Sequence, residues 1–305
     1  MILCVGEILA DMIGFEKDGG YAYERKAGGA PFNVACGVKK FGGKSVFAGS
    51  VGDDLIGEFL IEFAKKRGLD GLVIDRRGDA NTTLAFVQLD ERGERAFCFY
   101  RKNTADYLLP ELSDEVISGA GIVHIGSLML SEERGLEYAR RLADRAHSLG
   151  KKVSFDVNFR SDIFRDESAA AERYRVLLEA ADILKFSEEE IAVFGEEYIE
   201  KALGGKLVCV SLGADGSEWR YRGERGKVGS IPVKPVDTTG AGDAFFAGVL
   251  SGLDGTDESR WTAEFLNGVM QRANVCGALA TLGKGAIDCL PCEAEIEEKL
   301  GSLRK

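Results

Sequence analysis

Residues 237–248 read "DTTGAGDAFFAG" and place very small residues between two carboxylates, at the start of the apolar run "AFFAGVLSGL" (244–253). The apolar run predicts a buried helix. Small side chains at Gly240, Ala241 and Gly242 would let consecutive backbone N–H groups converge on an anion, helped by the positive end of the helix dipole. Ligands of open α/β sheets gather where strands end and helices begin, so this stretch predicts an anion site in such a sheet.

Asp243 follows the small residues directly. A carboxylate beside a bound polyphosphate would repel it, so we expect Asp243 to have a function there. Accepting a proton from an incoming hydroxyl group is such a function. The structural alternative is a helix cap, which an isolated aspartate often forms. The run of small residues before Asp243 favours a catalytic base.

Short apolar runs alternate with longer helical patterns along the chain. The predicted strands are 2–6, 45–52, 121–126, 152–158, 182–187 and 206–213. Apolar residues at helical spacing predict helices over 131–149 and 258–282. This alternation predicts an α/β fold with a doubly wound, mostly parallel sheet flanked by helices.

Two segments depart from the alternation. Residues 12–26 and 82–102 each show a strand, turn, strand pattern, with turns at Asp18–Gly20 and Asp90–Gly93. Neither contains a crossover helix, so we expect a small β-sheet lid at the edge of the main sheet. It would either close over a ligand or be a static hairpin. No linker or repeat divides the chain, which predicts a single domain over 1–305.

The composition limits the classes of partner. With 305 residues and 45% hydrophobic content, the chain can bury a sizeable core. A net charge of −11 argues against nucleic-acid binding, which needs a basic surface. The N-terminus lacks a basic leader and no apolar run reaches membrane-spanning length, so we expect a cytoplasmic protein without a membrane partner. A small molecule is the expected partner.

Several familiar site motifs are missing or incomplete. The seven cysteines are scattered and odd in number, which predicts reduced thiols, and Cys289 and Cys292 lack the further ligands that zinc requires. The stretch "GVKKFGGKS" (37–45) has one residue too many between its outer glycines for a Walker loop, and no G-x-G-x-x-G supports a nicotinamide oxidoreductase. His124 lacks a nucleophile motif, so we expect a core histidine.

Together with "AGGAPFNVA" (27–35), the stretch at 237–248 resembles the two signatures of the ribokinase-like (PfkB-type) carbohydrate kinase family. The resemblance extends through "GEILADM" (6–12), "GSVGDDLIG" (49–57), "VSLGADG" (210–216) and "RANVCGALATLGKGAID" (272–288). It implies an ATP-dependent kinase for a sugar hydroxyl group. Asp243 would be the general base, and the amides of 240–243 would hold the transferred phosphoryl group.

The resemblance also implies binding residues. For the sugar it points to Asp11, Gly28, Gly29, Asn33, Arg101 and Arg160. For the nucleotide it points to Lys185, Ser211, Gly213, Gly216, Asn274 and Gly277. Carboxylate and amide groups suit sugar hydroxyls, and glycines permit close approach. The structural alternatives are a helix start at Pro31 and, for each arginine, a solvated surface charge.

Metal-linked residues are implied as well. Glu190 matches the family's acidic residue associated with Mg²⁺ and phosphate in an N-x-x-E motif, although this chain has Ser187 in place of Asn. We expect that link to be indirect, and S-x-x-E is equally a capping box at a helix start. Asp237 and Thr239 match a monovalent-cation loop of some relatives. The implied cofactors are therefore ATP and Mg²⁺, with K⁺ as a further candidate.

Within the family, "YRKNTAD" (100–106), "DVNFR" (156–160) and "LKFSEEE" (184–190) are similar to fructokinases. Asp106 favours fructose, with fructose 6-phosphate as the product. The 2-keto-3-deoxygluconate kinases share the G-G-A-x-x-N-V-A and D-x-N-x-R patterns and are the main alternative. A non-catalytic sugar or nucleotide sensor is a further alternative, against which the intact Asp243 counts. The exposed face of the lid would suit a homodimer.

Overall fold

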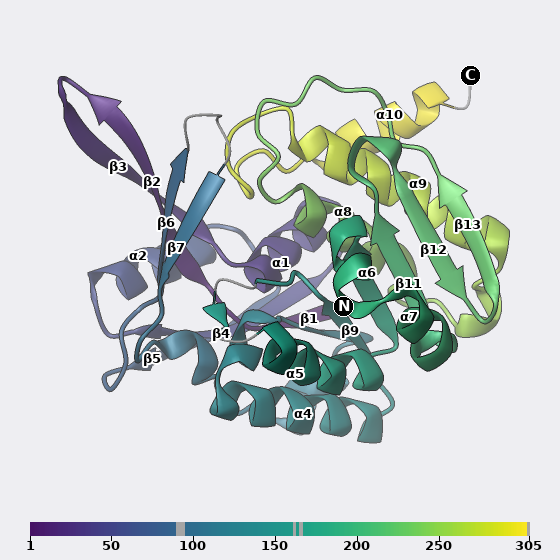
Figure 1. The fold of residues 1–305 in the computed structure, drawn as a ribbon, viewed down its shortest axis with the longest axis horizontal. Helices are drawn as coiled ribbons and strands as arrows, with labels where there is room; N and C mark the ends of the chain where they lie inside the picture. Colours follow the sequence, from purple (N-terminus) through teal and green to yellow (C-terminus); the bar gives the residue numbers. More distant parts are fainter. Residues whose placement is uncertain (90–94, 161–162, 165–166, 304–305) are drawn as a thin grey trace.

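The computed structural model describes residues 1–89, 95–160, 163–164 and 167–303, and it is built around a nine-stranded sheet in the order β13-β12-β11-β10-β9-β8-β1-β4-β5 (Figure 1). Its strands are β1 (Ile2–Val5), β4 (Ser45–Gly52), β5 (Gly71–Arg77), β8 (Ile122–Ile125), β9 (Lys152–Asp156), β10 (Ile183–Ser187), β11 (Leu207–Ser211), β12 (Ser217–Tyr221) and β13 (Glu224–Val228). Neighbours from β5 to β11 pair in parallel, whereas β12 and β13 are antiparallel. The predicted mostly parallel sheet is confirmed.

Helices cover both faces of this sheet. One face carries α1 (Ala30–Lys40), α2 (Leu55–Lys65), α8 (Ala241–Leu253), α9 (Ala263–Ala280) and α10 (Glu293–Leu303). The other carries α3 (Asp114–Ser118), α4 (Glu133–Ser148), α5 (Glu167–Ala180), α6 (Glu188–Phe194) and α7 (Glu196–Leu203). Strand β1 shows why its sequence is apolar throughout: Ile2 and Cys4 pack into the first layer, and Leu3 and Val5 into the second.

A second, four-stranded sheet has the order β3-β2-β6-β7 and projects from one end of the molecule (Figure 1). Its strands are β2 (Leu9–Lys17), β3 (Gly20–Gly28), β6 (Leu84–Leu89) and β7 (Arg95–Tyr100). The hairpin turn at Asp18 and Gly19 has φ of 51° and 75°, the left-handed values that a tight hairpin requires. The predicted turn at Asp90–Gly93 lies outside the described residues. We call this sheet the lid.

One predicted helix needs correction, and three strands were not predicted. The helix expected over 258–282 begins only at Ala263, because the Thr262 side chain accepts a hydrogen bond from the Phe265 N–H and caps it. Residues 258–260 form a separate 3₁₀ turn, η5. The edge strand β5 and the hairpin β12–β13 were missed. Their charged residues mask the apolar alternation that identified the central strands.

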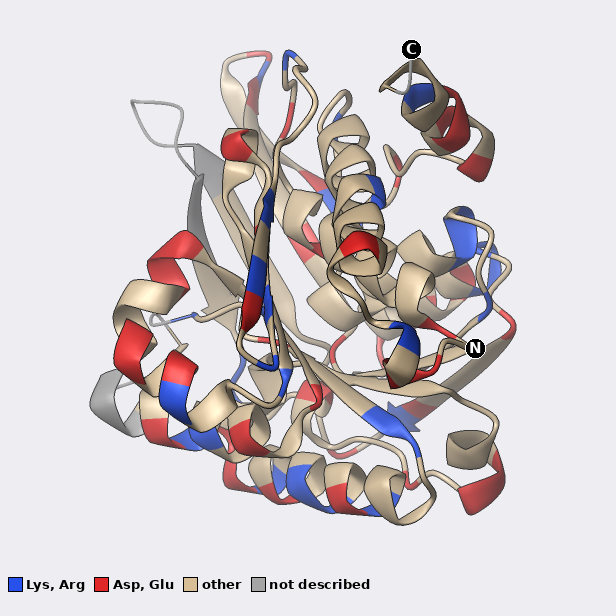
Figure 2. Ribbon diagram, turned by 90° about the vertical axis from the view of Figure 1, so that its right-hand side faces the viewer, with Lys and Arg blue, Asp and Glu red and all other residues tan. Residues whose placement is uncertain are grey.

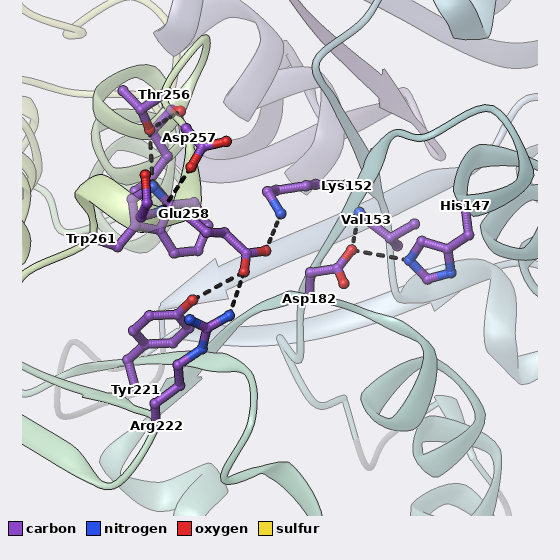
Figure 3. Close-up of polar contacts among 12 residues, drawn as sticks. His147, Lys152, Val153, Asp182, Tyr221, Arg222, Thr256, Asp257, Glu258 and Trp261 are labelled. Atoms are coloured by element: carbon purple, nitrogen blue, oxygen red, sulfur yellow. Dashed lines mark hydrogen bonds and ion pairs between the residues drawn. The ribbon is translucent and has the colours of Figure 1, made fainter.

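The amino-terminal edge of the large sheet is fastened by charged contacts (Figure 3). Glu258 accepts hydrogen bonds from Lys152 Nζ, from Tyr221 Oη at 3.1 Å and from Arg222 Nη2 at 2.8 Å. Lys152 begins β9 and Tyr221 ends the antiparallel β12, so one carboxylate joins two strands to η5. These contacts stabilise the edge opposite to the glycine-rich turns.

The surface charges, the helices, the cysteines and His124 each bear on an expectation drawn from the sequence. Acidic and basic residues are interspersed on the helices at the lower edge of Figure 2, without a broad basic face there. None of the helices in the described part of the chain has the length and apolar character needed to cross a bilayer. All seven cysteines are free thiols. His124 is buried on β8, and burial lowers its pKa to about 3, which confirms a core histidine.

Candidate active site

Two adjoining cavities open at the carboxyl ends of the central strands. The first has a volume of about 390 Å³ and lies among β11, α8 and α9. The second, of about 320 Å³, lies between α1, α8 and the lid. Thr238 and Gly242 line both cavities, so the glycine turn before α8 is the wall between them. We call them the apolar cavity and the polar cavity, respectively.

The turn between the cavities depends on its small residues. Gly240 has φ 75°, and a methyl group added to it would lie 2.5 Å from Ala286 Cβ. A methyl group added to Gly242 would lie 3.3 Å from Lys185 Nζ. The backbone therefore approaches its neighbours more closely than a larger residue would permit.

The free amides at the start of α8 are those of Gly240, Gly242 and Asp243. The Ala241 N–H donates to the Thr238 carbonyl, and the Ala244 N–H donates to the Gly240 carbonyl. Among the described residues no acceptor contacts the N–H groups of Gly240, Gly242 and Asp243. Of the predicted amides, that of Ala241 already has an acceptor in the chain, and the anion site itself stays a prediction.

Asp243 lies in the first turn of α8 but does not cap it, since the cap position is taken by Gly240 and no side-chain cap is present. Its Oδ2 accepts a hydrogen bond of 2.7 Å from Asn33 Nδ2. Burial raises the pKa of Asp243, outweighing the opposing effects of Asn33, Lys185 and Arg160. A carboxylate with a raised pKa is better suited to accept a proton near neutral pH.

The polar cavity collects most residues that were expected to bind the sugar. Its lining includes Asp11, Gly29, Asn33 and Arg160. Gly28 lies behind Asp11, because a methyl group at Gly28 would be 2.3 Å from Asp11 Oδ2. Gly29 has φ 112° and packs against the Glu7 carbonyl, so the di-glycine turn brings β2 and β3 close together. The helix start that was the alternative is also present, with α1 beginning at Ala30.

The lid forms part of the polar cavity. Asp11 on β2 pairs with Ala85 on β6, and Ala85 pairs with Phe99 on β7. This register places the three side chains on one face, and Asp11 and Phe99 line the cavity. The outer face carries exposed Tyr23 and Tyr100.

Arg101 was expected to approach the sugar, but it is not among the residues that line the polar cavity. Its Nε donates to Asp106 at 2.9 Å, its Nη1 to Ser131 Oγ at 2.6 Å and its Nη2 to the Leu128 carbonyl at 3.1 Å. Asp106 also accepts from Thr104 Oγ1 at 2.6 Å. Arg101 is therefore not a solvated surface charge, and it lines a separate cavity beside Tyr100 and Lys102. It anchors the end of β7 to the body of the protein.

The apolar cavity collects the residues that were expected to bind the nucleotide, with one exception. Its lining includes Ser211, Gly213, Gly216, Asn274 and Gly277. Ile231, Val233 and Phe245 make its surface apolar, and the Asn274 side chain donates to the Val228 carbonyl at 3.0 Å. An apolar slot beside a glycine turn suits a flat heterocycle whose phosphates reach that turn.

Lys185 is the exception, because it lines the polar cavity. Its Nζ contacts both carboxylate oxygens of Asp156, at 2.9 and 3.1 Å, and both side chains are buried. Burial alone would lower the pKa of Lys185, but Asp156 and Glu190 raise it above its ordinary value. Burial raises the pKa of Asp156. The sequence prediction missed Asp156, although it begins the quoted "DVNFR" pattern.

Glu190 forms the capping box that was its structural alternative. Its Oε1 accepts the Phe159 N–H at 2.6 Å and its Oε2 accepts the Ser187 N–H at 2.7 Å, while Ser187 Oγ accepts the Glu190 N–H. Both oxygens are thus engaged by backbone groups, and Glu190 lines neither cavity. Within the described ranges, no cluster of three or more His, Cys, Asp or Glu side chains could hold a metal ion. The link of Glu190 to Mg²⁺ stays a prediction.

Asp237 and Thr239 form a compact loop beside the glycine turn. Asp237 Oδ1 accepts from the Thr239 N–H and hydroxyl group, at 2.8 and 2.7 Å, and Oδ2 accepts from the Gly285 N–H at 3.0 Å. Thr239 also lines the polar cavity. The predicted cation role of this loop remains a prediction.

Glu7 is a further cavity residue that the sequence prediction missed, although it stands in the quoted "GEILADM" stretch. Its Oε1 accepts the Ala30 N–H at 3.0 Å, and its buried Oε2 has no partner among the described residues. Burial raises the pKa of Glu7 to about 8. The cavity therefore holds a second carboxyl group that is costly to ionise.

Comparisons with known proteins agree with this arrangement. Residues 1–293 match the family described as pfkB family carbohydrate kinase. The chain is 35% identical to probable fructokinase-7 of Arabidopsis thaliana, an alignment covering 100% of this chain and 93% of that protein. The crystal structure of a Xylella fastidiosa fructokinase with bound ATP matches with a TM-score of 0.92 and 32% identity, covering 100% and 99% of the two chains. A fructokinase double mutant from Vibrio cholerae O395, in a fructose, ADP and potassium ion bound form, matches with a TM-score of 0.85 and 30% identity over 97% of each chain.

Proposed function

The chain belongs to the pfkB family of carbohydrate kinases, and we propose that it transfers the γ-phosphoryl group of ATP to a hydroxyl group of fructose, giving fructose 6-phosphate. One observation carries this proposal: two cavities meet at a glycine turn, with a buried carboxylate at the junction. Phosphoryl transfer needs its two reactants on opposite sides of an anion site, in line with each other.

The apolar cavity would hold the adenosine of ATP, and the polar cavity would hold the sugar. The free amides of Gly242 and Asp243 would then contact the γ-phosphoryl group from the start of α8. Asp243 would take the proton of the attacking hydroxyl group. Asn33 holds the Asp243 carboxylate through a 2.7 Å hydrogen bond and thereby orients the base.

The sugar would be held by groups that the polar cavity brings together. Asp11 and Asn33 offer oxygen acceptors, and Arg160 offers a cation. Closure of the lid would exclude water through Phe99, which matters because water would otherwise compete as the acceptor. The preference for fructose is supported by the similar proteins named as fructokinases.

Metal ions would assist at two places. Mg²⁺ bound with the nucleotide would neutralise the charge of its phosphates. Glu190 would act on it through water, because both carboxylate oxygens accept backbone hydrogen bonds. The loop of Asp237 and Thr239 would bind K⁺, an ion that is also bound in the Vibrio cholerae fructokinase structure. Replacing K⁺ by tetramethylammonium should then lower kcat, and unchanged turnover would contradict this cation role.

A homodimer through the lid is supported by the outer lid face. Tyr23, Phe86 and Tyr100 form a row with ring centroids 5.2 and 5.1 Å apart, and Tyr100 is 61% exposed. Exposed aromatic rows of this kind favour contact with another apolar face. Light scattering should show a dimer for the wild type and a monomer for Tyr23→Ser/Tyr100→Ser. A monomeric wild type would contradict the dimer.

The activity is tested by coupling ADP release to a spectrophotometric assay with five acceptors: fructose, 2-keto-3-deoxygluconate, ribose, tagatose and adenosine. We expect the highest kcat/KM with fructose and a 6-phosphate product by ³¹P NMR. A preference for 2-keto-3-deoxygluconate would move the substrate to the alternative that shares the D-x-N-x-R pattern. Binding of sugar without ADP release from any acceptor would indicate a sensor.

A further inference from the structure

Strand β9 carries a charged residue at each end, and the two differ in their surroundings. Lys152 at the amino end pairs with Glu258, and both side chains are partly exposed. Asp156 at the carboxyl end pairs with Lys185, and the two side chains are only 3% and 8% exposed. The pair of Asp156 and Lys185 is therefore almost completely removed from water.

A buried ion pair is expensive to form. The loss of hydration of two charges offsets most of their attraction, and apolar side chains of similar size would stabilise a fold equally well. Asp156 and Lys185 connect adjacent strands, β9 and β10, that already pair through their backbones. Stabilisation of the sheet gives little reason for a buried pair at this place.

The position of the Lys185 ammonium supplies another reason. It lines the polar cavity, and its Nζ lies 3.3 Å from the position that a methyl group on Gly242 would occupy. The same glycine contributes a free amide to the junction of the two cavities. Both carboxylate oxygens of Asp156 accept hydrogen bonds from the Lys185 ammonium, at 2.9 and 3.1 Å, and these bonds restrict its movement.

We propose that Asp156 is a positioning residue that holds the Lys185 ammonium against the Gly240–Gly242 turn, where Lys185 contacts the transferred phosphoryl group together with the free amides of Gly242 and Asp243. This inference rests on the proposed phosphoryl transfer. It moves Lys185 from the nucleotide pocket to the site of transfer, and it gives Asp156 a role.

The charges around Lys185 agree with this role. Besides Asp156, the groups that influence its pKa include Glu190 on α6 and Asp243 on α8, and both raise it. His124 on β8 faces it as a neutral ring, because burial lowers the pKa of His124 to about 3. Cys209 on β11 faces it as a neutral thiol, because burial raises its pKa. Lys185 thus stays protonated, and its charge depends on its carboxylate neighbours.

The test compares Lys185→Met, Asp156→Asn and the double variant with wild type, in the ADP-release assay with saturating ATP and fructose. Lys185→Met should lower kcat about 10²-fold, the usual effect of losing one contact to a developing anion, with the KM for fructose changed only a few-fold. Asp156→Asn should also lower kcat. Lys152→Met is the matched control on the same strand, and its kcat should equal that of wild type.

The double variant separates positioning from stability. Asp156→Asn alone leaves a buried charge without its partner, so that protein is expected to unfold at a lower temperature. Asp156→Asn/Lys185→Met removes both charges and should recover most of the melting temperature. On our proposal its kcat stays as low as that of Lys185→Met. A double variant that recovers both melting temperature and kcat would show that the pair is only structural.

The pH profile gives a second readout that a structural role would not change. Burial lowers the pKa of Lys185 and Asp156 raises it, so Asp156→Asn should lower that pKa. Because the ammonium must be protonated, the fall of kcat at alkaline pH should begin at a lower pH in Asp156→Asn than in wild type. An unchanged alkaline limb would overturn the positioning role.

Binding of ADP with aluminium fluoride, measured by calorimetry, tests Lys185 without an acceptor sugar. Lys185→Met should weaken this complex at least tenfold while binding ADP alone as wild type does. Equal binding of the fluoride complex would overturn the inference whatever the turnover. If wild type releases no ADP with any acceptor but Lys185→Met still weakens the complex, the proposed function fails and the phosphoryl contact stands.

Discussion

The two edges of the nine-stranded sheet place carboxylates in opposite surroundings. At the amino edge, Glu258 is partly exposed and accepts hydrogen bonds from Lys152 and Tyr221 (Figure 3). The Lys152 contact is the main reason that the pKa of Glu258 is lowered. At the carboxyl edge, Asp243 is buried with Asn33 as its donor, and burial raises its pKa.

This difference separates groups that hold the fold together from groups that serve a reaction. A paired carboxylate near the surface stabilises the native state and titrates at low pH. Carboxyl groups at the cavities, Asp243 and Glu7, are instead held where ionisation is unfavourable. Proteins tolerate such groups mainly at functional sites. The carboxyl edge should therefore respond to substitution in activity, and the amino edge in stability.

The largest effect is expected for Asp243→Asn. Asparagine fills the same space but cannot accept the proton, so kcat should fall about 10²–10⁴-fold. Binding of fructose and of ATP, measured by calorimetry, should change only a few-fold. Turnover close to that of wild type would remove Asp243 from the role of base.

The next largest loss of turnover is expected at Gly240, and Gly255 at the opposite end of α8 serves for comparison. Gly240 and Gly255 have φ of 75° and 74°, so the backbone strain of alanine should cost each about 1 kcal/mol of folding free energy. Only Gly240 is crowded, since an added methyl would lie 2.5 Å from Ala286 Cβ. Gly240→Ala should displace the glycine turn before α8 and lower kcat roughly 10²-fold.

Gly255→Ala is the control for backbone strain, because an added methyl at Gly255 meets nothing within 4 Å. Its urea unfolding midpoint should fall, although less than that of Gly240→Ala because the added methyl meets no neighbour, while its kcat stays at the wild-type value. Equal kcat in the two variants would show that the shape of the turn before α8 does not matter for transfer.

A smaller effect, on stability alone, is expected for Glu258→Gln. The amide keeps the size of the carboxylate but weakens its contacts to Lys152 and Arg222, which should cost about 1–2 kcal/mol. Turnover should be unchanged. Glu297→Gln, in an exposed pair with Arg272, is the control and should change the unfolding free energy by less than about 0.5 kcal/mol.

The smallest effect is a difference in pH dependence. The pKa of Asp243 is raised in the folded state, so its contribution to stability is present at acid pH and lost as the pH rises through that pKa. Asp243→Asn should therefore gain stability relative to wild type as the pH rises. The lowered pKa of Glu258 has the opposite consequence. The stability deficit of Glu258→Gln should disappear as the pH falls through that pKa, which urea titrations at several pH values would detect.

The central strands and the glycine turn before α8 were predictable from the sequence because their patterns are local. Residues 45–52, predicted as one strand, form β4 with the same bounds, since continuous apolar residues suit burial on both faces. The small residues before α8 likewise indicated an anion site. The hairpin β12–β13 was missed because its outer residues, such as Arg220 and Lys227, are polar.

The arrangement of the site was only partly predictable, because it depends on contacts between distant segments. The Asn33 and Asp243 side chains are 210 positions apart in the chain and meet at 2.7 Å. Family resemblance assigned Lys185 to the nucleotide and Arg101 to the sugar. Those two assignments stay predictions. The structure adds the ion pairs of these residues with Asp156 and Asp106, which spacing in the sequence does not reveal.

The functional difference between the two edges of the sheet is tested most directly by measuring, in parallel at pH 7, the turnover and the unfolding free energy of Asp243→Asn and Glu258→Gln. We predict that Asp243→Asn loses transfer of phosphate to fructose yet unfolds no more easily than wild type. Glu258→Gln should keep its turnover and lose stability. Normal turnover in Asp243→Asn, or loss of activity and stability together in both variants, would contradict the separation of the two edges.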